Sequence, residues 1–238
     1  MALLAFSVPA LAEGNGQTRP PAAAQNPDDG WRGIVYPVYG WLPIYGADTR
    51  LPDVPGESSI SSSLNQAFLA AFRVEKGHFA LEGGYVYAGL SGDAERPIMK
   101  LEVDTNIADL RAGFEVATDL YLEGGVRWLA LDVKATVADY PTASWKPAML
   151  EPVVGFTYRP LVGKHWRFVL HGDVGGLVTG DSTTANGAIK LEWQPAKHFL
   201  LVAGGTVMYL GTEGTIGPKS VKLDQTLYGP IIGVGIPF

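Results

Sequence analysis

The sequence predicts an all-β chain that forms a closed antiparallel transmembrane β-barrel of about ten strands. Three observations predict this fold. Segments in which apolar and polar residues alternate recur along the chain, and each is bounded by turn residues. Short connections between these segments alternate with longer ones. The last segment has a row of apolar residues on one face and ends at Phe238.

The composition suits such a fold and excludes several functional classes. The 238 residues include 30 Gly and 17 Pro, which favours many turns and strongly curved strands. Cysteine is absent, so disulfides, thiolate metal sites and cysteine nucleophiles are excluded together. The net charge is −6 and Lys and Arg form no run, so nucleic-acid binding has no electrostatic basis.

Two short segments precede the predicted barrel. Residues 1–12 are predicted to be a secretory signal peptide, because an apolar stretch is followed by the small-x-small site Ala10-Leu11-Ala12. This segment lacks a charged start, which indicates a clipped signal; a short buried helix is the alternative. Residues 13–30 are polar and predict a disordered periplasmic linker. The outer-membrane barrel is assigned to residues 31–238.

Ten segments carry the strand pattern, and their connections predict an orientation. The segments are Trp31–Tyr45, Ser62–Glu75, His78–Ser91, Met99–Val116, Leu120–Val137, Met149–Pro160, Trp166–Gly180, Thr184–Gln194, Phe199–Gly211 and Leu223–Phe238. Short connections lie at 75–77, 117–119, 161–165 and 195–197, and mostly longer ones at 47–61, 92–98, 138–148, 181–183 and 212–222. Long loops are expected outside the cell and short turns in the periplasm, so an even strand count places both termini in the periplasm.

Apolar and charged residues take opposite faces of the predicted strands. In the seventh segment, Trp166 and Phe168 fall on one face, while Arg167 and Asp173 fall on the other. A membrane barrel turns its apolar face to lipid, whereas a soluble lipocalin-like barrel turns it inward. Aromatic residues near segment ends, such as Trp166 and Trp193, favour the membrane barrel because such residues form girdles at lipid–water interfaces. The lipocalin-like barrel is the alternative.

The fourth segment departs from the simple alternation. Leu110 and Phe114 are apolar at even positions, whereas Leu101 and Val103 are apolar at odd ones. A one-residue slip would reconcile the two halves, so we expect either a bulge near Asn106 or an upper half that stands above the membrane. The ninth segment is apolar on both faces and gives no clean register.

The closing segment indicates how the chain reaches the membrane. Its apolar residues share one face and run to a terminal aromatic, a pattern that resembles the signal read by the barrel-assembly machinery. The predicted assembly signal consists of Tyr228, Ile232, Val234, Ile236 and Phe238. The expected partners are this machinery and outer-membrane lipid; the oligomeric state is left open.

Four stretches carry a family resemblance: residues 36–43 (YPVYGWLP), 109–114 (DLRAGF), 171–176 (HGDVGG) and 227–238 (LYGPIIGVGIPF). On these stretches the chain resembles a broad group of uncharacterised bacterial outer-membrane barrels of the small OmpA- and OmpW-like kind. The resemblance implies the architecture and a location in the bacterial outer membrane. It implies no catalytic residues, because the group has no assigned activity.

The inward face is predicted to hold a network of charges. Seven cationic residues face seven acidic ones: Arg32, Arg73, Arg111, Arg127, Arg159, Arg167 and Lys190 against Glu82, Asp109, Glu115, Glu123, Glu151, Asp173 and Glu192. Because isolated buried charges are costly, these groups must pair or stay hydrated. We interpret them as a structural ion-pair network that fills a small barrel. The alternative is a narrow passive pore or a small-molecule cavity.

A hydrolase is the competing functional class. Of the four histidines, His171 lies inside a strand, two residues from Asp173 on the same face, a spacing that could orient an imidazole. An omptin-like protease or a lipid A-modifying enzyme would use these two residues in the lumen. No Ser stands in a nucleophile motif, so we expect His171 to belong to the charge network and the protein not to be an enzyme. No metal-ligand cluster or cofactor motif is found, so neither is expected.

Overall fold

The computed structural model contains one antiparallel sheet that closes into a barrel. It describes residues 30–41, 44–50, 58–59, 61–95, 98–137, 143–146, 148–176, 182–216 and 219–238. The predicted signal peptide and the predicted linker, except for its last residue, lie outside these ranges. Within them the chain has no helix with the length and hydropathy needed to cross a membrane.

The strands agree closely with the predicted segments. They are β1 Arg32–Trp41, β2 Ile44–Arg50, β3 Ser58–Ser59, β4 Ser61–Lys76, β5 Phe79–Glu95, β6 Ile98–Ala117, β7 Leu120–Val137, β8 Ala143–Trp145, β9 Ala148–Tyr158, β10 Trp166–Gly175, β11 Ser182–Ala196, β12 Phe199–Ile216 and β13 Lys219–Pro237. Strands β1 and β2 take the place of the first segment. The short strands β3 and β8 are additions that pair with β2 and β7.

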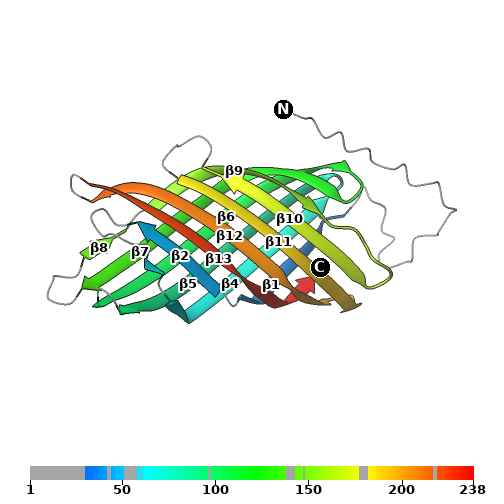
Figure 1. The fold of residues 1–238 in the computed structure, drawn as a ribbon. Coiled ribbons are helices and arrows are strands. Elements are labelled where there is room, and N and C mark those ends of the chain that lie inside the picture. Colours follow the sequence, from blue (N-terminus) through cyan, green and yellow to red (C-terminus); the bar gives the residue numbers. More distant parts are fainter. Residues whose placement is uncertain are drawn as a thin grey trace, which may run out of the picture.

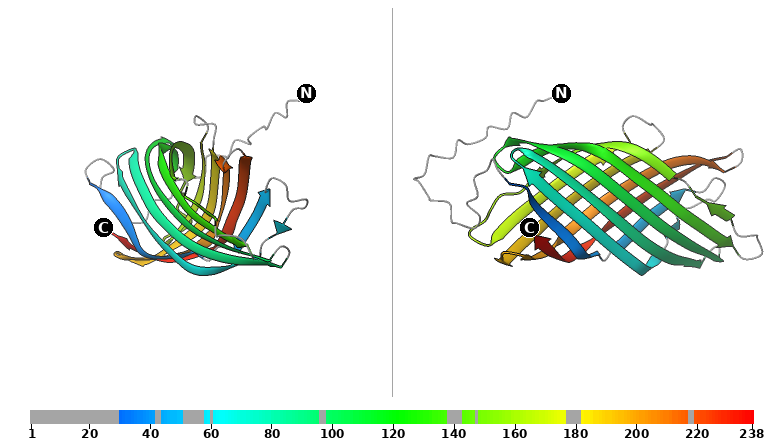
Figure 2. Two further views of the ribbon diagram at one scale, coloured as in Figure 1. Left: turned by 90° about the vertical axis from the view of Figure 1, so that its left-hand side faces the viewer. Right: turned by 180° about the vertical axis from the view of Figure 1, so that it is seen from behind.

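The barrel is closed by its first strand. Strand β1 pairs with β4 on one side and with β13 on the other, so the sheet returns to its starting edge. The remaining strands pair antiparallel in the order β4-β5-β6-β7-β9-β10-β11-β12-β13. Counting β1 and β2 as one, ten strands make up the wall in the described part of the chain (Figures 1 and 2). The prediction of a closed antiparallel barrel of about ten strands is confirmed.

Tight turns gather at one end of the barrel, where the chain also ends (Figure 1). Gly77 and Asp119 take positive φ values of 57° and 61° in the turns that join β4 to β5 and β6 to β7. Glycine adopts this conformation freely and Asp tolerates it, which explains these residue types. Phe238 hydrogen-bonds with Gly33 through both backbone groups, at 2.9 and 3.0 Å. The first strand of the barrel therefore begins, and the last strand ends, at the rim with the short turns. The periplasmic placement of this rim stays a prediction.

At the opposite, loop end, two predicted long loops are shorter than expected. The predicted loop at 212–222 is mostly a ladder, because β12 and β13 remain paired to Ile216 and Lys219. The predicted loop at 92–98 is also mostly ladder, with Glu95 paired to Ile98. We ended these segments where the apolar alternation stopped, but antiparallel hydrogen bonds continue through polar residues wherever the strands stand in water.

The wall is apolar outside and charged inside. Leu150 and Ile232 point outward and are 63% and 70% exposed, whereas the inward Arg127 and Glu151 are each 1% exposed. A soluble barrel would show the opposite arrangement, so the lipocalin-like alternative is wrong. Ring pairs lie near the short turns: Trp166 stacks on Trp193 with ring centroids 5.7 Å apart. Such pairs are typical of the girdle at a lipid–water interface.

Strand β6 contains no bulge near Asn106, so that expectation is wrong. Its pairing with β5 runs without a shift from Ile98 to Phe114, and its pairing with β7 shifts only next to Glu115. The strand is unbroken, and the types of residue on its inner and outer faces change along its length. Val103 and Ile107 point inward and are buried, while the outward Lys100 is exposed. The loop half of β6 therefore has the pattern of a strand whose outer face meets water, which fits the second expectation of an upper half above the membrane.

A buried apolar cluster fills the loop half of the lumen. It comprises Trp41, Ile107, Leu129, Leu131, Met208, Leu210, Leu227 and Ile231, all at most 8% exposed. We call it the apolar layer. Along β6 and β7 these residues are nearer the loops, and the inward charged residues are nearer the short turns. The ninth predicted segment, now β12, is apolar on both faces because its inner face supplies Met208 and Leu210 to this layer.

Candidate functional site

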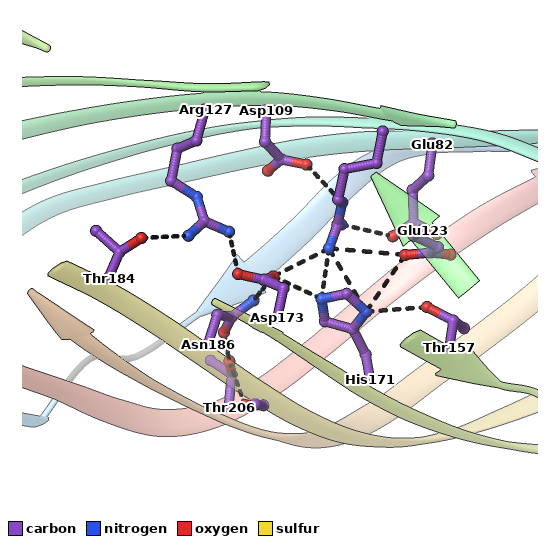
Figure 3. A network of polar contacts seen from close by, with 12 residues as sticks. Glu82, Asp109, Glu123, Arg127, Thr157, His171, Asp173, Thr184, Asn186 and Thr206 are labelled. Carbon is purple, nitrogen blue, oxygen red and sulfur yellow. Dashed lines mark hydrogen bonds and ion pairs between the residues drawn. The ribbon is translucent and has the colours of Figure 1, made fainter. Parts of the chain in front are cut away.

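The charged interior beside the short turns is the candidate functional site, and Asp173 of β10 lies at its centre (Figure 3). Its carboxylate accepts hydrogen bonds from Arg127 Nη2 at 2.6 Å and from Arg111 Nη1 at 3.1 Å. His171 Nε2 lies 2.7 Å from the same group, and Asn186 Nδ2 donates at 3.3 Å. Two guanidinium groups therefore compensate a carboxylate that is only 4% exposed.

A second group of contacts forms around Arg73 on β4. Its Nε donates to Glu75 at 2.7 Å, and its Nη1 donates to Glu82 at 2.7 Å and to Glu123 at 3.1 Å. The guanidinium carbon also lies 4.7 Å from the ring centroid of Tyr121. This cation therefore has three carboxylates and one aromatic face around it, and it is 3% exposed.

Arg159 links the network to the opposite wall. Its two Nη groups donate to Glu75 at 2.8 Å and to Glu192 at 3.1 Å. The Tyr36 hydroxyl donates to the same Glu192 carboxylate at 2.8 Å. Because Tyr36 lies on β1 and Glu192 on β11, these contacts join two strands that are not neighbours in the wall.

Glu151 is held in the same manner by β7 and β11. Arg127 Nη1 lies 3.8 Å from its carboxylate, and the Thr184 hydroxyl donates a hydrogen bond to it. Thr184 also accepts a hydrogen bond from Arg127 at 3.0 Å. Arg127 is therefore shared between the Glu151 and Asp173 carboxylates, and Arg111 also reaches Asp173, at 3.1 Å.

Strand register explains why these charges meet. Arg73 stands directly opposite Glu82, and Glu82 stands opposite Arg111, across β4, β5 and β6. Asp109 likewise faces Arg127, and Arg127 faces Glu151, across β6, β7 and β9. Directly opposed residues on neighbouring strands interact most strongly, so alternating signs along these rows place each charge beside a partner.

Glycines make room for the long charged side chains. Gly125 stands opposite Arg111, and a Cβ there would overlap the backbone of Leu110 and Arg111. Gly155 stands opposite Asp173 and could not carry a Cβ for the same reason. At these two positions the backbone and side chains of the neighbouring strand therefore occupy the space that a Cβ would need.

The structure brings together most of the predicted network. Arg32 and Glu115 lie at its margin, and Arg167 and Lys190 interact electrostatically with Glu192 inside it. Eleven predicted residues form ion pairs or hydrogen bonds with one another in the interior: Arg73, Glu82, Asp109, Arg111, Glu123, Arg127, Glu151, Arg159, His171, Asp173 and Glu192. Arg32 is exposed at the start of β1, and Arg167 and Lys190 are half-buried. Glu115 lies at the short-turn rim, 3.1 Å from His78 and 2.9 Å from the backbone nitrogen of Asp119, which donates to it.

Sequence reasoning missed several polar members. Glu75 bridges Arg73 and Arg159, yet we placed it where a strand meets a turn and left it out of the network. Its spacing of two from Arg73 was the signal that it shares the inward face. Thr157 and Thr184 were missed because an inward hydroxyl in a strand carries no charge pattern. Tyr36 was missed because an aromatic residue in an apolar stretch carries no charge pattern, although it shares the even positions of that segment with Arg32.

His171 contacts a hydroxyl, a carboxylate and a guanidinium at once. Thr157 Oγ1 lies 2.9 Å from its Nδ1, and Asp173 lies 2.7 Å from its Nε2, where Arg111 Nη1 also makes contact. The order hydroxyl, imidazole, carboxylate is that of a hydrolase triad. However, His171 is 5% exposed and Thr157 is 1% exposed, so no substrate reaches the hydroxyl in this conformation.

The predicted assembly residues share one face of β13. Tyr228, Ile232, Ile236 and Phe238 are exposed and Val234 is half-buried, all on the outer surface. The Phe238 ring covers Gly33, where a Cβ would overlap it. Their common orientation is confirmed, and their role in assembly stays a prediction. Within the described ranges, no group of three or more His, Asp or Glu residues is arranged to hold a metal ion.

An apolar outer wall around a paired, buried charge network gives this chain the architecture of an outer-membrane β-barrel. No family model matches the sequence, and no curated protein matches it. Solved structures similar to it include the attachment invasion locus protein Ail of Yersinia pestis, with a TM-score of 0.43, 11% identity and coverage of 88% of this chain and 99% of that one. The outer-membrane protease OmpT of Escherichia coli gives a TM-score of 0.49 and 8% identity over 88% and 97% of the two chains.

The outer-membrane protein OprG of Pseudomonas aeruginosa is a third similar structure, with a TM-score of 0.35 and 13% identity over 89% of this chain and 97% of that one. The three proteins are described as, respectively, an attachment invasion locus protein, a protease and an outer-membrane protein. At such low identities and TM-scores these similarities carry no functional information, so the function is argued from the residues of this chain.

Proposed function

We propose that this protein is a structural barrel of the bacterial outer membrane whose lumen is closed, and that it is not a passive pore. The observation that carries the proposal is the burial of the inward charges. Arg73, Arg127 and Glu151 are at most 3% exposed, so very little of their surface is open to water. A conducting pore keeps its selectivity charges hydrated, because ions pass them in water.

The apolar layer provides a second closure above the charged one. Its eight residues come from β1, β6, β7, β12 and β13, which lie on several sides of the barrel. An ion that passed the charge network would next have to enter an apolar region, where an unpaired charge costs several kcal/mol or more. The two layers together favour a closed barrel over a narrow channel.

The part of the barrel beyond the apolar layer then supplies the surface on which a structural role depends. Strands β6 and β7 continue past the lipid-facing residues, with exposed polar side chains such as Lys100 and Lys134. Lys146 and Asp132 form an exposed ion pair there at 2.6 Å. We infer a rigid, water-exposed extension at the loop end, carried by a barrel that anchors it in the membrane.

A solute-uptake assay tests the closed lumen. Vesicles that contain the folded protein are placed in a hypertonic solution of a small sugar, and swelling is followed by light scattering. The proposal predicts the swelling rate of protein-free vesicles. Swelling that rises in proportion to the amount of folded protein would contradict it.

The expected partners are outer-membrane lipid and the barrel-assembly machinery. Exposed apolar residues surround the wall, and the outward face of β13 ends in the aromatic Phe238. Deletion of Phe238 is predicted to lower the amount of folded, heat-modifiable protein in outer-membrane fractions, whereas Val116→Ala, a change at another exposed apolar residue near the short turns, should not. Equal insertion of the Phe238 deletion would contradict the assembly role.

The hydrolase remains the second candidate, because Thr157, His171 and Asp173 stand in the order of a catalytic triad. A hydrolase would need the lumen to open so that a lipid or peptide could reach Thr157. We expect no reaction when folded protein is incubated with lipid A or with peptide libraries. A reaction that Thr157→Val and His171→Ala each abolish, while the barrel stays folded, would establish this candidate in place of ours.

A further inference from the structure

The outer surface of the barrel carries a groove across β9, β10, β11 and β12. Its volume is about 490 Å³. Its lining includes Phe156, Gly172, Gly187 and Val207, which stand opposite one another across these four strands. The Phe156 ring lies over Gly172, and Gly187 is the more open position. Gly172 and Gly187 are direct partners in the β10–β11 ladder, so two neighbouring positions of the wall have no side chain. The groove is therefore a local consequence of glycine pairing on one face of the sheet.

The groove faces outward, away from the charge network. Phe156 and Val207 are 38% and 47% exposed on the outer wall, next to Val154 at 55%. Asp173 and Asn186 belong to the same stretch of wall, but their side chains contact each other and Arg127 inside the lumen. The lining on the outer side consists of backbone, apolar side chains such as Val154 and Val174, and the aromatic Tyr209. The groove is thus continuous with the apolar surface that meets lipid.

We propose that this groove binds one acyl chain of a membrane diacyl lipid as a resident ligand. An unfilled hollow facing hydrocarbon forfeits dispersion contacts with its lining atoms, so a flexible apolar chain gains contacts there that a flat wall does not offer. Phe156 and Val207 line the groove beside the glycine positions, so a chain in it contacts these side chains as well as the backbone between them. The proposal rests on the membrane location proposed above.

Two leucine substitutions form a matched test. At Gly187 a Cβ would meet Val207 Cγ1 at 3.6 Å, an ordinary contact, so Gly187→Leu fills the groove without straining the wall. Gly124 on β7 also points outward, and a Cβ there would meet only the Val153 carbonyl oxygen at 4.0 Å. Gly124→Leu therefore adds the same side chain to the outer wall outside the groove. Heat-modifiability and circular dichroism show whether each variant is folded and inserted.

The readout is retained lipid. Each protein is inserted into vesicles of palmitoyl-oleoyl phosphatidylcholine, released in mild detergent and examined by native mass spectrometry. The wild-type barrel and Gly124→Leu should each keep a mass increment of one lipid. Gly187→Leu should keep about tenfold less, the change expected when roughly two methylene groups lose their contact.

Each other outcome would overturn the proposal. Equal retention by Gly187→Leu and wild type would mean that the groove holds no particular lipid. Equal loss in both leucine variants would mean general disturbance of the outer wall. A wild-type dimer that only Gly187→Leu dissociates would assign the groove to a second copy of this chain. Failure of the wild-type barrel to insert at all would instead contradict the membrane location on which the proposal rests.

Discussion

Arg127 illustrates how a single residue can be held inside a membrane barrel. Its guanidinium lies 2.6 Å from Asp173 and 3.8 Å from Glu151, and it donates to Thr184 at 3.0 Å. The side chain is 1% exposed, so these contacts, together with the opposing Asp109, compensate for the loss of water. An ion pair in such surroundings adds little net stability, but removing one partner leaves an uncompensated charge.

Removal of this one cation should therefore be severe. Arg127→Ala leaves Asp173 and Glu151 buried without their shared partner, and it is predicted to lower the free energy of unfolding by about 3–5 kcal/mol. Urea unfolding in lipid vesicles, followed by tryptophan fluorescence, measures the change. Lys146→Ala is the control because it breaks an ion pair whose side chains are 65% and 27% exposed, and it should cost less than about 1 kcal/mol. Similar costs for the two variants would mean that the lumen is hydrated.

Most of this network was predictable residue by residue from the parity of positions in each strand. Parity places Arg73, Glu82 and Arg111 on the inward face without any knowledge of their neighbours. Which cation contacts which carboxylate was not predictable, because the partners are set by register between strands far apart in the chain. Arg159 and Glu75, for example, are separated by 84 residues.

At the scale of the element, β6 shows where alternation alone misleads. Its inward residues change from charged Asp109 and Arg111 to buried Ile107 and Val103 without any break in the ladder. Apolar residues move from the outer to the inner face because the outer face meets lipid in one half of the strand and water in the other. We predicted a bulge or an upper half above the membrane because one strand offered no way to choose; only the paired strands β5 and β7 decide between them.

The change of environment along β6 predicts different costs for two similar truncations. Ile107→Ala opens a cavity in the apolar layer and should lower the free energy of unfolding by about 2–4 kcal/mol. Leu110 is 46% exposed on the outer wall, where lipid can occupy the space, so Leu110→Ala should cost at least about 1 kcal/mol less. The same unfolding assay compares them. A larger cost for Leu110→Ala would contradict the assignment of Ile107 to a packed interior.

At the scale of the whole molecule, the two ends of the barrel differ in a way that predicts orientation. The tight turns lie at the same rim as the beginning of the first strand and the end of the last strand. At the opposite rim the strands extend further (Figure 1). The order of short and long connections was visible in the sequence, because turn residues mark it. The length of the strand extensions was not, because polar residues pair in water without an apolar pattern.

The absence of cysteine allows this orientation to be measured without background. Lys146→Cys lies at the loop end, and Lys197→Cys lies in the turn between β11 and β12. A membrane-impermeant maleimide added to whole cells should label the first variant and leave the second unlabelled until the cells are broken. Labelling of Lys197→Cys in intact cells would reverse the predicted topology.

The central claim is that the charge network and the apolar layer close the lumen, and planar-bilayer conductance tests it most directly. Folded wild-type protein is predicted to insert without steady ion current, because neither layer offers a hydrated path. A steady conductance in the wild-type barrel would contradict this claim. If Arg127→Ala also changed the ion selectivity of that current and left the stability of the barrel unchanged, the lumen would be a selective pore.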